Sequence, residues 1–205
     1  DGVITADQDR KVIGNANPKH TGGLNINARY KAFDLSMLFN WVYGNDVYNT
    51  GLIEFQMLFH TTYGNMLNTM NSENRYMYID TETGEEITDL DRLAEVNKDK
   101  TMWSPFSSGT TKPLFHSGAI EDGSFLRLNT VSLGYSLPDN LLSKVGMERF
   151  RIYGTVYNAW IWTNYSGYDP EVSTTQSGSQ RQLTPGVDYS AYPKSRSYVL
   201  GVNLT

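Results

Sequence analysis

Two stretches of this sequence alternate apolar and polar residues so regularly that they restrict the chain to extended structure. One is Phe33–Tyr43 and the other is Arg196–Thr205. In the second stretch every other residue is apolar, namely Tyr198, Leu200, Val202 and Leu204. A period of two places these side chains on one face of a β-strand and the small or polar residues on the other. Such a strand suits the edge of a soluble sheet or the wall of a transmembrane barrel.

The same pattern predicts an all-β chain with five long strands. They cover residues 20–30, 33–43, 124–136, 149–160 and 196–205. The connections alternate between short and long, and the long ones are residues 44–122 and 161–195. In an antiparallel meander the short connections then lie at one end of the sheet and the long ones at the other, which is typical of outer-membrane barrels. The facing of residues 124–128 and of the fourth strand stays ambiguous, because apolar residues occupy both sides.

Strand length and aromatic placement favour a membrane barrel. Strands of roughly ten residues match the ~9–11 residues that a tilted strand needs to cross a bilayer, whereas strands in globular proteins usually have about five or six. Tyr30 and Phe33 lie at one end of the first hairpin, and Trp41 and Tyr43 lie at the other, where interfacial girdles would be expected. The alternative is a soluble amphipathic hairpin within a β-sandwich glycan-binding module.

Composition excludes several classes of protein. The net charge of −5 argues against a nucleic-acid partner. The lack of cysteine excludes a disulfide scaffold and a zinc–thiolate site. No window holds the ~18 consecutive apolar residues of a membrane helix. The chain begins at Asp1 rather than at a methionine, so we expect a fragment of a longer protein.

Few residues suggest chemistry. Residues 1–4 (DGVI) resemble the second half of a calcium loop, so calcium at Asp1 is one interpretation and a polar turn is the other. His60 and His116 have no acid or cysteine at ligand spacing, and we expect structural roles for both. Asp169 and Glu171 flank a proline, which favours a turn over a catalytic carboxylate pair. We therefore predict no catalytic residues and no metal site, with a secreted glycoside hydrolase fragment as a distant alternative.

Several motifs in this order resemble the C-terminal end of SusC/RagA-type TonB-dependent outer-membrane transporters. The matching segments are residues 1–18 (DGVIT…DR…VIGNANP), 30–39 (YKAFDLSMLF), 44–49 (GNDVYN), 124–138 (SFLRLNTVSLGYSLP), 162–172 (WTNYSGYDPEV) and 192–205 (YPKSRSYVLGVNLT). They cover both ends of the chain and most of the predicted strands. The resemblance identifies the chain as the last five strands of a large antiparallel barrel.

This resemblance implies a 22-stranded barrel whose N-terminal plug and remaining strands lie outside the chain. It implies uptake of glycans or oligopeptides together with a SusD-like surface lipoprotein, energised by TonB. The C-terminus would be periplasmic, and residues 44–122 and 161–195 would be extracellular loops that contact substrate or the lipoprotein. Tyr198, Gly201 and Leu204 match the pattern by which assembly machinery reads the last strand. The transported molecule, the oligomeric state and the individual substrate-contacting residues do not follow from the sequence.

Overall fold

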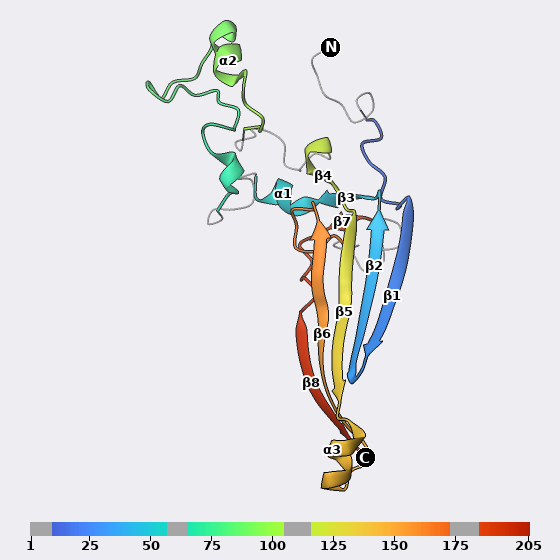
Figure 1. Cartoon of the computed structure of the whole chain (residues 1–205). Coiled ribbons are helices and arrows are strands. Elements are labelled where there is room, and N and C mark those ends of the chain that lie inside the picture. Colours follow the sequence, from blue (N-terminus) through green and yellow to red (C-terminus); the bar gives the residue numbers. More distant parts are fainter. Residues whose placement is uncertain (1–9, 57–64, 105–115, 173–184) are drawn as a thin grey trace. The chain divides into compact units, whose positions relative to one another are not determined.

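Five long β-strands dominate the computed structural model, which describes residues 10–56, 65–104, 116–172 and 185–205. They form one antiparallel sheet in the order β1-β2-β5-β6-β8 (Figure 1). Their bounds are β1 His20–Tyr30, β2 Phe33–Tyr43, β5 Phe125–Ser136, β6 Phe150–Thr163 and β8 Ser197–Leu204. The spatial order follows the chain order, so the sheet is a meander of the kind that the alternating connections predict.

The strand bounds differ from the sequence prediction mainly in the fourth strand. The first two strands have the predicted bounds, whereas β6 continues to Thr163 instead of ending at residue 160. The extension forms because Trp162 and Thr163 pair with Leu126 and Phe125 of β5. The second long connection therefore begins after Thr163, three residues later than predicted.

An irregularity in the centre of the sheet resolves the ambiguous facing of β5. In β5, Asn129 lies between Leu128 and Thr130, which pair with the adjacent residues Phe39 and Leu38 of β2. One extra residue in a strand shifts its alternation by one position, so the side chains on either side of it change face. The even-numbered leucines before Asn129 and the odd-numbered apolar residues after it therefore share one face.

The short connections lie together at one end of the sheet. Lys31 takes a positive φ of 53° in the turn between β1 and β2. Helix α3, Asp139–Val145, joins β5 to β6 and ends at Gly146, whose φ is 65°. The N-cap of this helix is Pro138, and Asp139 is the first helical residue. An acidic residue in the first turn interacts favourably with the helix dipole.

The long connections carry secondary structure of their own. Strands β3 (Asp46–Asn49), β4 (Ile120–Asp122) and β7 (Val187–Asp188) form a three-stranded sheet in the order β4-β3-β7. By its internal contacts the chain divides into residues 1–48 with 120–205, and residues 49–119. The first unit holds the five-stranded sheet.

The second unit contains short helical elements. They are α1 Thr50–Glu54, η1 Asn68–Met70, α2 Leu90–Asn97 and η2 Ser117–Ala119. Asp89 caps α2 by accepting a hydrogen bond from the Arg92 backbone N–H at 2.7 Å. None of the described helices is both long and apolar enough to cross a bilayer.

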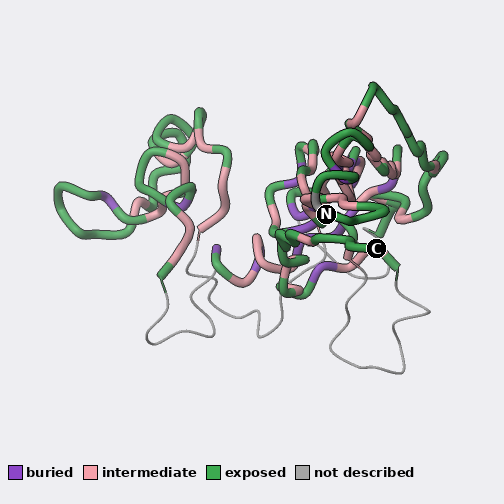
Figure 2. The backbone as a smooth tube through the Cα atoms, turned by 60° about the horizontal axis from the view of Figure 1, so that its bottom comes forward, coloured by how far each residue is buried: buried purple, intermediate pink, exposed green. Residues whose placement is uncertain are grey.

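Few described residues are buried, and the long strands are mostly exposed or half-buried (Figure 2). The buried apolar residues of the first unit are Val47, Tyr48, Phe125, Leu142 and Tyr165. Apart from Leu142, these residues belong to the ends of the strands and to the long connections, so the five-stranded sheet has no apolar core of its own among the described residues.

Candidate functional site

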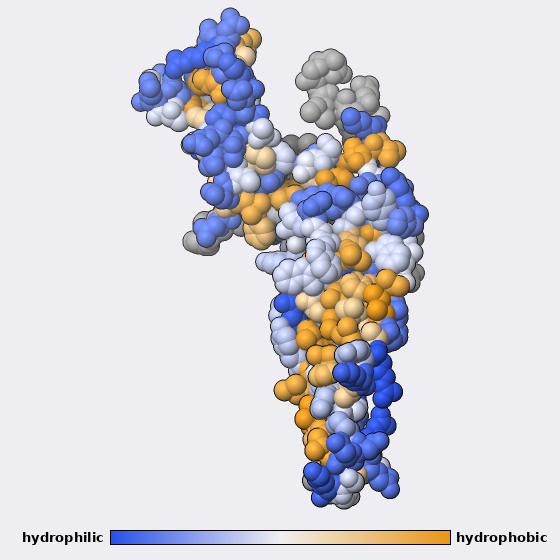
Figure 3. Space-filling model, in the orientation of Figure 1, coloured by the Kyte–Doolittle hydropathy of each residue, from blue (hydrophilic) through white to orange (hydrophobic). Residues whose placement is uncertain are grey.

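One face of the five-stranded sheet is continuously apolar. The pairing register places Ile26 of β1, Met37 of β2 and Val131 of β5 side by side. The same row continues through Val156 of β6 to Tyr198 of β8. These side chains stay accessible, and Leu200 on this face is 87% exposed. Apolar residues gather over the long strands in the space-filling view (Figure 3). A sandwich would bury such a face under a second sheet, and no sheet among the described residues covers it.

Aromatic residues border this apolar face at both ends. Tyr30, Phe33 and Tyr135 lie at the end with the short connections, and the Phe33 and Tyr135 rings are 4.8 Å apart. At the other end lie the rings of Trp41, Tyr43, Trp160 and Trp162. Phe33 and Trp41 are separated by eight residues, which is roughly 27 Å along a strand at about 3.4 Å per residue. With a tilt of about 35–45° this length projects to roughly 20 Å along the membrane normal, which approaches the apolar band of about 25 Å between aromatic girdles.

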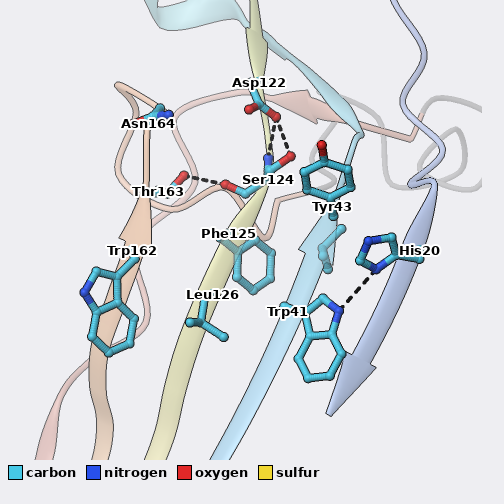
Figure 4. Close-up of a pocket in the computed structure, with 11 residues that line it drawn as sticks. His20, Trp41, Tyr43, Asp122, Ser124, Phe125, Leu126, Trp162, Thr163 and Asn164 are labelled. Atoms are coloured by element: carbon cyan, nitrogen blue, oxygen red, sulfur yellow. Dashed lines mark hydrogen bonds between the residues drawn. The ribbon is translucent and has the colours of Figure 1, made fainter. Parts of the chain in front are cut away.

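A hollow of about 540 Å³ lies at the end with the long connections (Figure 4). Trp41 and Trp162 stand on either side of Leu126 along this hollow. The Trp41 indole N–H donates to His20 Nδ1 at 3.2 Å. Polar groups of Asp122, Ser124, Thr163 and Asn164 close its upper edge. The lining of the hollow thus changes from apolar to polar along the strand direction, as aromatic residues at a membrane–water interface require.

The opposite face is mainly polar and carries an ion pair that crosses three strands. Arg151 of β6 donates to Asp34 of β2 through Nε at 3.0 Å and Nη2 at 2.6 Å. Gly134 of β5 lies between them, and a Cβ atom there would be 2.4 Å from Arg151 Nη2. A glycine is needed at this position because the charged groups meet directly above its Cα. Two parallel charge-assisted bonds fix the geometry better than one.

A second charge cluster lies on the polar face near the long connections. Arg127 of β5 is 1% exposed. Its Nη2 atom lies 2.5 Å from Asp169 Oδ1, and its Nη1 atom donates to Asn158 Oδ1 at 2.6 Å. Its Nε atom lies 3.5 Å from Glu171 Oε2. Both carboxylates that raised the question of catalysis therefore bind one arginine, and this arrangement organises the loop after β6.

The far end of the same connection meets the same cluster. Asn158, which has a positive φ of 51°, donates through Nδ2 to the Lys194 carbonyl at 2.8 Å. The Lys194 ammonium lies 2.5 Å from Glu171 Oε2. Arg196 Nε donates to the Asn158 carbonyl at 3.1 Å. Residues 169–171 and residues 194–196, which belong to opposite ends of this connection, are therefore bound at the same place on the polar face.

A buried tyrosine links this connection to the three-stranded sheet. The Tyr165 hydroxyl donates to Asp188 Oδ2 at 2.6 Å. Burial, with the hydrogen bond to the Asp188 carboxylate, raises the pKa of Tyr165 well above its usual range. Ser166 donates through its backbone N–H and its hydroxyl to the Glu121 carboxylate, at 2.9 and 2.6 Å. These bonds order the polypeptide above the sheet.

The predicted assembly residues do not share one face of β8. The register places Tyr198 and Leu204 on the apolar face, where they are 73% and 60% exposed. Gly201 lies on the polar face beneath the Tyr153 ring, and a Cβ atom there would be 2.3 Å from Tyr153 Cζ. The role of these three residues in assembly remains a prediction.

The described residues contain no group of three or more His, Asp or Glu side chains that could hold a metal ion. His116 is half-buried, and its ring meets Trp103 edge-on at 4.4 Å. Burial lowers the pKa of His116. Asp1 and His60 lie outside the described residues. Sequence reasoning did not single out Arg127 as a site residue, although an arginine between two leucines in a predicted strand was the signal available.

The sequence is similar to TonB-dependent receptors. It is 32% identical over 197 residues to the TonB-dependent receptor P3 of Formosa agariphila, covering 96% of this chain and 17% of that protein. It is 34% identical over 87 residues to the TonB-dependent receptor SusC of Bacteroides thetaiotaomicron, covering 42% of this chain and 8% of that protein. No family model matches the chain. The chain thus spans less than a fifth of the length of these relatives.

The fold matches solved structures of the RagAB peptide transporter. One superposes with a TM-score of 0.69 at 22% identity, covering 98% of this chain and 19% of that one. The closed-closed state of the RagAB peptide importer gives a TM-score of 0.68 at 23% identity over the same shares. The prediction of an all-β fold with five long antiparallel strands is confirmed by this match and by the strand order.

Proposed function

We propose, from the premise that this chain is homologous to one segment of the SusC-like TonB-dependent receptors, that it forms part of the wall of an outer-membrane importer. Its apolar face contacts lipid, and its polar face lines the path of the imported molecule. The observation that carries this proposal is the separation of the two faces across five strands, with aromatic rows at both ends of the apolar one. A wall between lipid and water requires this distribution over strands of such length.

The proposal extends to the rest of the importer. The barrel has 22 strands and an N-terminal plug, TonB supplies the energy, and a SusD-like lipoprotein covers the extracellular side. The connections within residues 44–122 and 161–195 are extracellular, and the C-terminus is periplasmic. The imported molecules are glycans or oligopeptides, and the RagAB structures, which are named as peptide transporters, favour oligopeptides.

Adjacent residues on opposite faces test the membrane orientation. Leu133, which is 52% exposed, lies on the apolar face of the central strand β5, and Ser132 lies next to it on the polar face. Spin labels on Leu133→Cys and Ser132→Cys in the intact transporter should differ in their accessibility to two paramagnetic reagents, oxygen and a nickel chelate. We expect the first to collide with oxygen dissolved in lipid and the second with a water-soluble nickel chelate. Equal access of the nickel chelate to both labels would refute the lipid-facing assignment.

Uptake tests the importer itself. Cells that make the intact transporter should accumulate labelled oligopeptides or oligosaccharides only when TonB is present. Accumulation of one class and not the other identifies the substrate class. Equal accumulation in cells with and without the transporter would contradict the proposed function.

A further inference from the structure

We propose that Arg127 is a positioning residue that fixes the two described ends of the β6–β8 connection, residues 169–171 and 194–196, on the polar face beside the path of the imported molecule. The existence of a path along the polar face rests on the proposed function. The positioning itself rests on contacts among the described residues.

Arg127 reaches the first end of the connection directly. Its guanidinium binds Asp169 at 2.5 Å, and the Asp169 carboxylate also accepts the Glu171 backbone N–H at 2.9 Å. The Asp169 side chain is almost fully buried, with 8% of its surface exposed. Residues 169–171 are therefore held to β5 by a pair of charges that water does not screen.

Arg127 reaches the second end through Asn158. The Asn158 amide accepts from Arg127 at 2.6 Å with its oxygen and donates to the Lys194 carbonyl at 2.8 Å with its nitrogen. Glu171 adds a second link, because one carboxylate oxygen lies 3.5 Å from Arg127 Nε and 2.5 Å from Lys194 Nζ. One guanidinium thus reaches both ends of the connection, which the Tyr165–Asp188 hydrogen bond also joins closer to its middle.

The chemistry of arginine suits this task. Its planar fork presents several donors in fixed directions, whereas a lysine ammonium is a single point charge on a flexible stem. A buried ion pair contributes little net stability relative to a well-packed apolar pair, because both charges lose water. Its contribution here is directional, since the partners of Arg127 come from two segments, residues 169–171 and Asn158 of β6.

Spin labels on the two ends test the inference in the intact transporter. Tyr168 and Tyr192 are 75% and 93% exposed, so Tyr168→Cys and Tyr192→Cys disturb little packing. This chain contains no other cysteine. Each labelled protein is combined with one substitution in the cluster, and the ratio of mobile to immobile components in the electron paramagnetic resonance spectrum is measured.

The expected shifts differ between variants. Arg127→Gln should increase the mobile component at both labels, and Asp169→Asn should increase it mainly at residue 168. Asn158→Gly keeps the positive φ but removes both amide contacts, so it should increase mobility mainly at residue 192. The matched control is Lys194→Gln, which removes only the exposed ion pair with Glu171 and should shift both spectra less than Arg127→Gln does.

Folding is checked in each variant by heat-dependent migration in gel electrophoresis. If Arg127→Gln does not fold, Asp169→Asn and Asn158→Gly carry the test. Unchanged spectra at both labels in folded Arg127→Gln, or in these two variants, would overturn the inference and leave the importer proposal intact. Altered spectra together with uptake that is absent even in the wild-type protein would instead overturn the importer proposal and leave the positioning role standing.

Discussion

At the scale of single residues, Gly134 determines whether the polar face can hold its cross-strand ion pair. A Cβ atom there would lie within 2.6 Å of both Asp34 carboxylate oxygens and 2.4 Å from Arg151 Nη2. We expect Gly134→Ala to push the pair apart and to destabilise the protein by about 1–3 kcal/mol, as overpacking does. Gly154→Ala is the matched control, because its Cβ would meet only Leu200 Cδ2 at an ordinary 3.5 Å. Equal urea-unfolding midpoints for the two variants would contradict this expectation.

A second residue-scale prediction concerns the phenol of Tyr165. Its raised pKa means that folding favours the protonated form, so this contribution is complete below the unfolded-state pKa of about 10 and is lost as pH rises toward the folded-state value. Tyr165→Phe should cost roughly 1–3 kcal/mol near neutral pH, because the hydrogen bond to the Asp188 carboxylate is lost. In thermal unfolding the difference from wild type should shrink above pH ~10. Tyr168→Phe, at an exposed site, should have no comparable effect, and a pH-independent difference for Tyr165→Phe would refute the assignment.

At the scale of elements, the extra residue in β5 keeps the two faces chemically distinct. Without Asn129, Leu126 and Leu128 would turn to the polar face and Arg127 would turn toward the apolar one, because alternation is strictly local. We expect deletion of Asn129 to prevent formation of a heat-resistant folded barrel, whereas Asn129→Ala should fold. The measurement is the fraction of folded protein in outer-membrane preparations. Normal folding of the deletion variant would show that the register can adjust elsewhere.

At the scale of the whole molecule, the five strands expose an apolar face and two strand edges that have no partner among the described strands. Unpaired edges next to exposed apolar surface promote aggregation. We therefore expect the isolated 205-residue chain to aggregate in buffer and to remain dispersed only in detergent. The measurement is size-exclusion chromatography with light scattering. A monomer that unfolds cooperatively in buffer would favour the β-sandwich alternative and contradict the barrel wall.

The local pattern of the sequence determined the five long strands, and it determined the two faces and the aromatic ends of the first hairpin. A period of two depends only on neighbouring residues, so Phe33–Tyr43 could be assigned without knowledge of its partners. The face of Arg127 could not, because it depends on the bulge at Asn129 and thus on pairing between strands. The ion pairs Arg127–Asp169 and Asp34–Arg151 join residues 42 and 117 positions apart, and only the tertiary register brings them together. Alternation is a property of one strand, whereas charge pairing is a property of the assembled sheet. For this reason only the tertiary structure decided which charged residues form pairs.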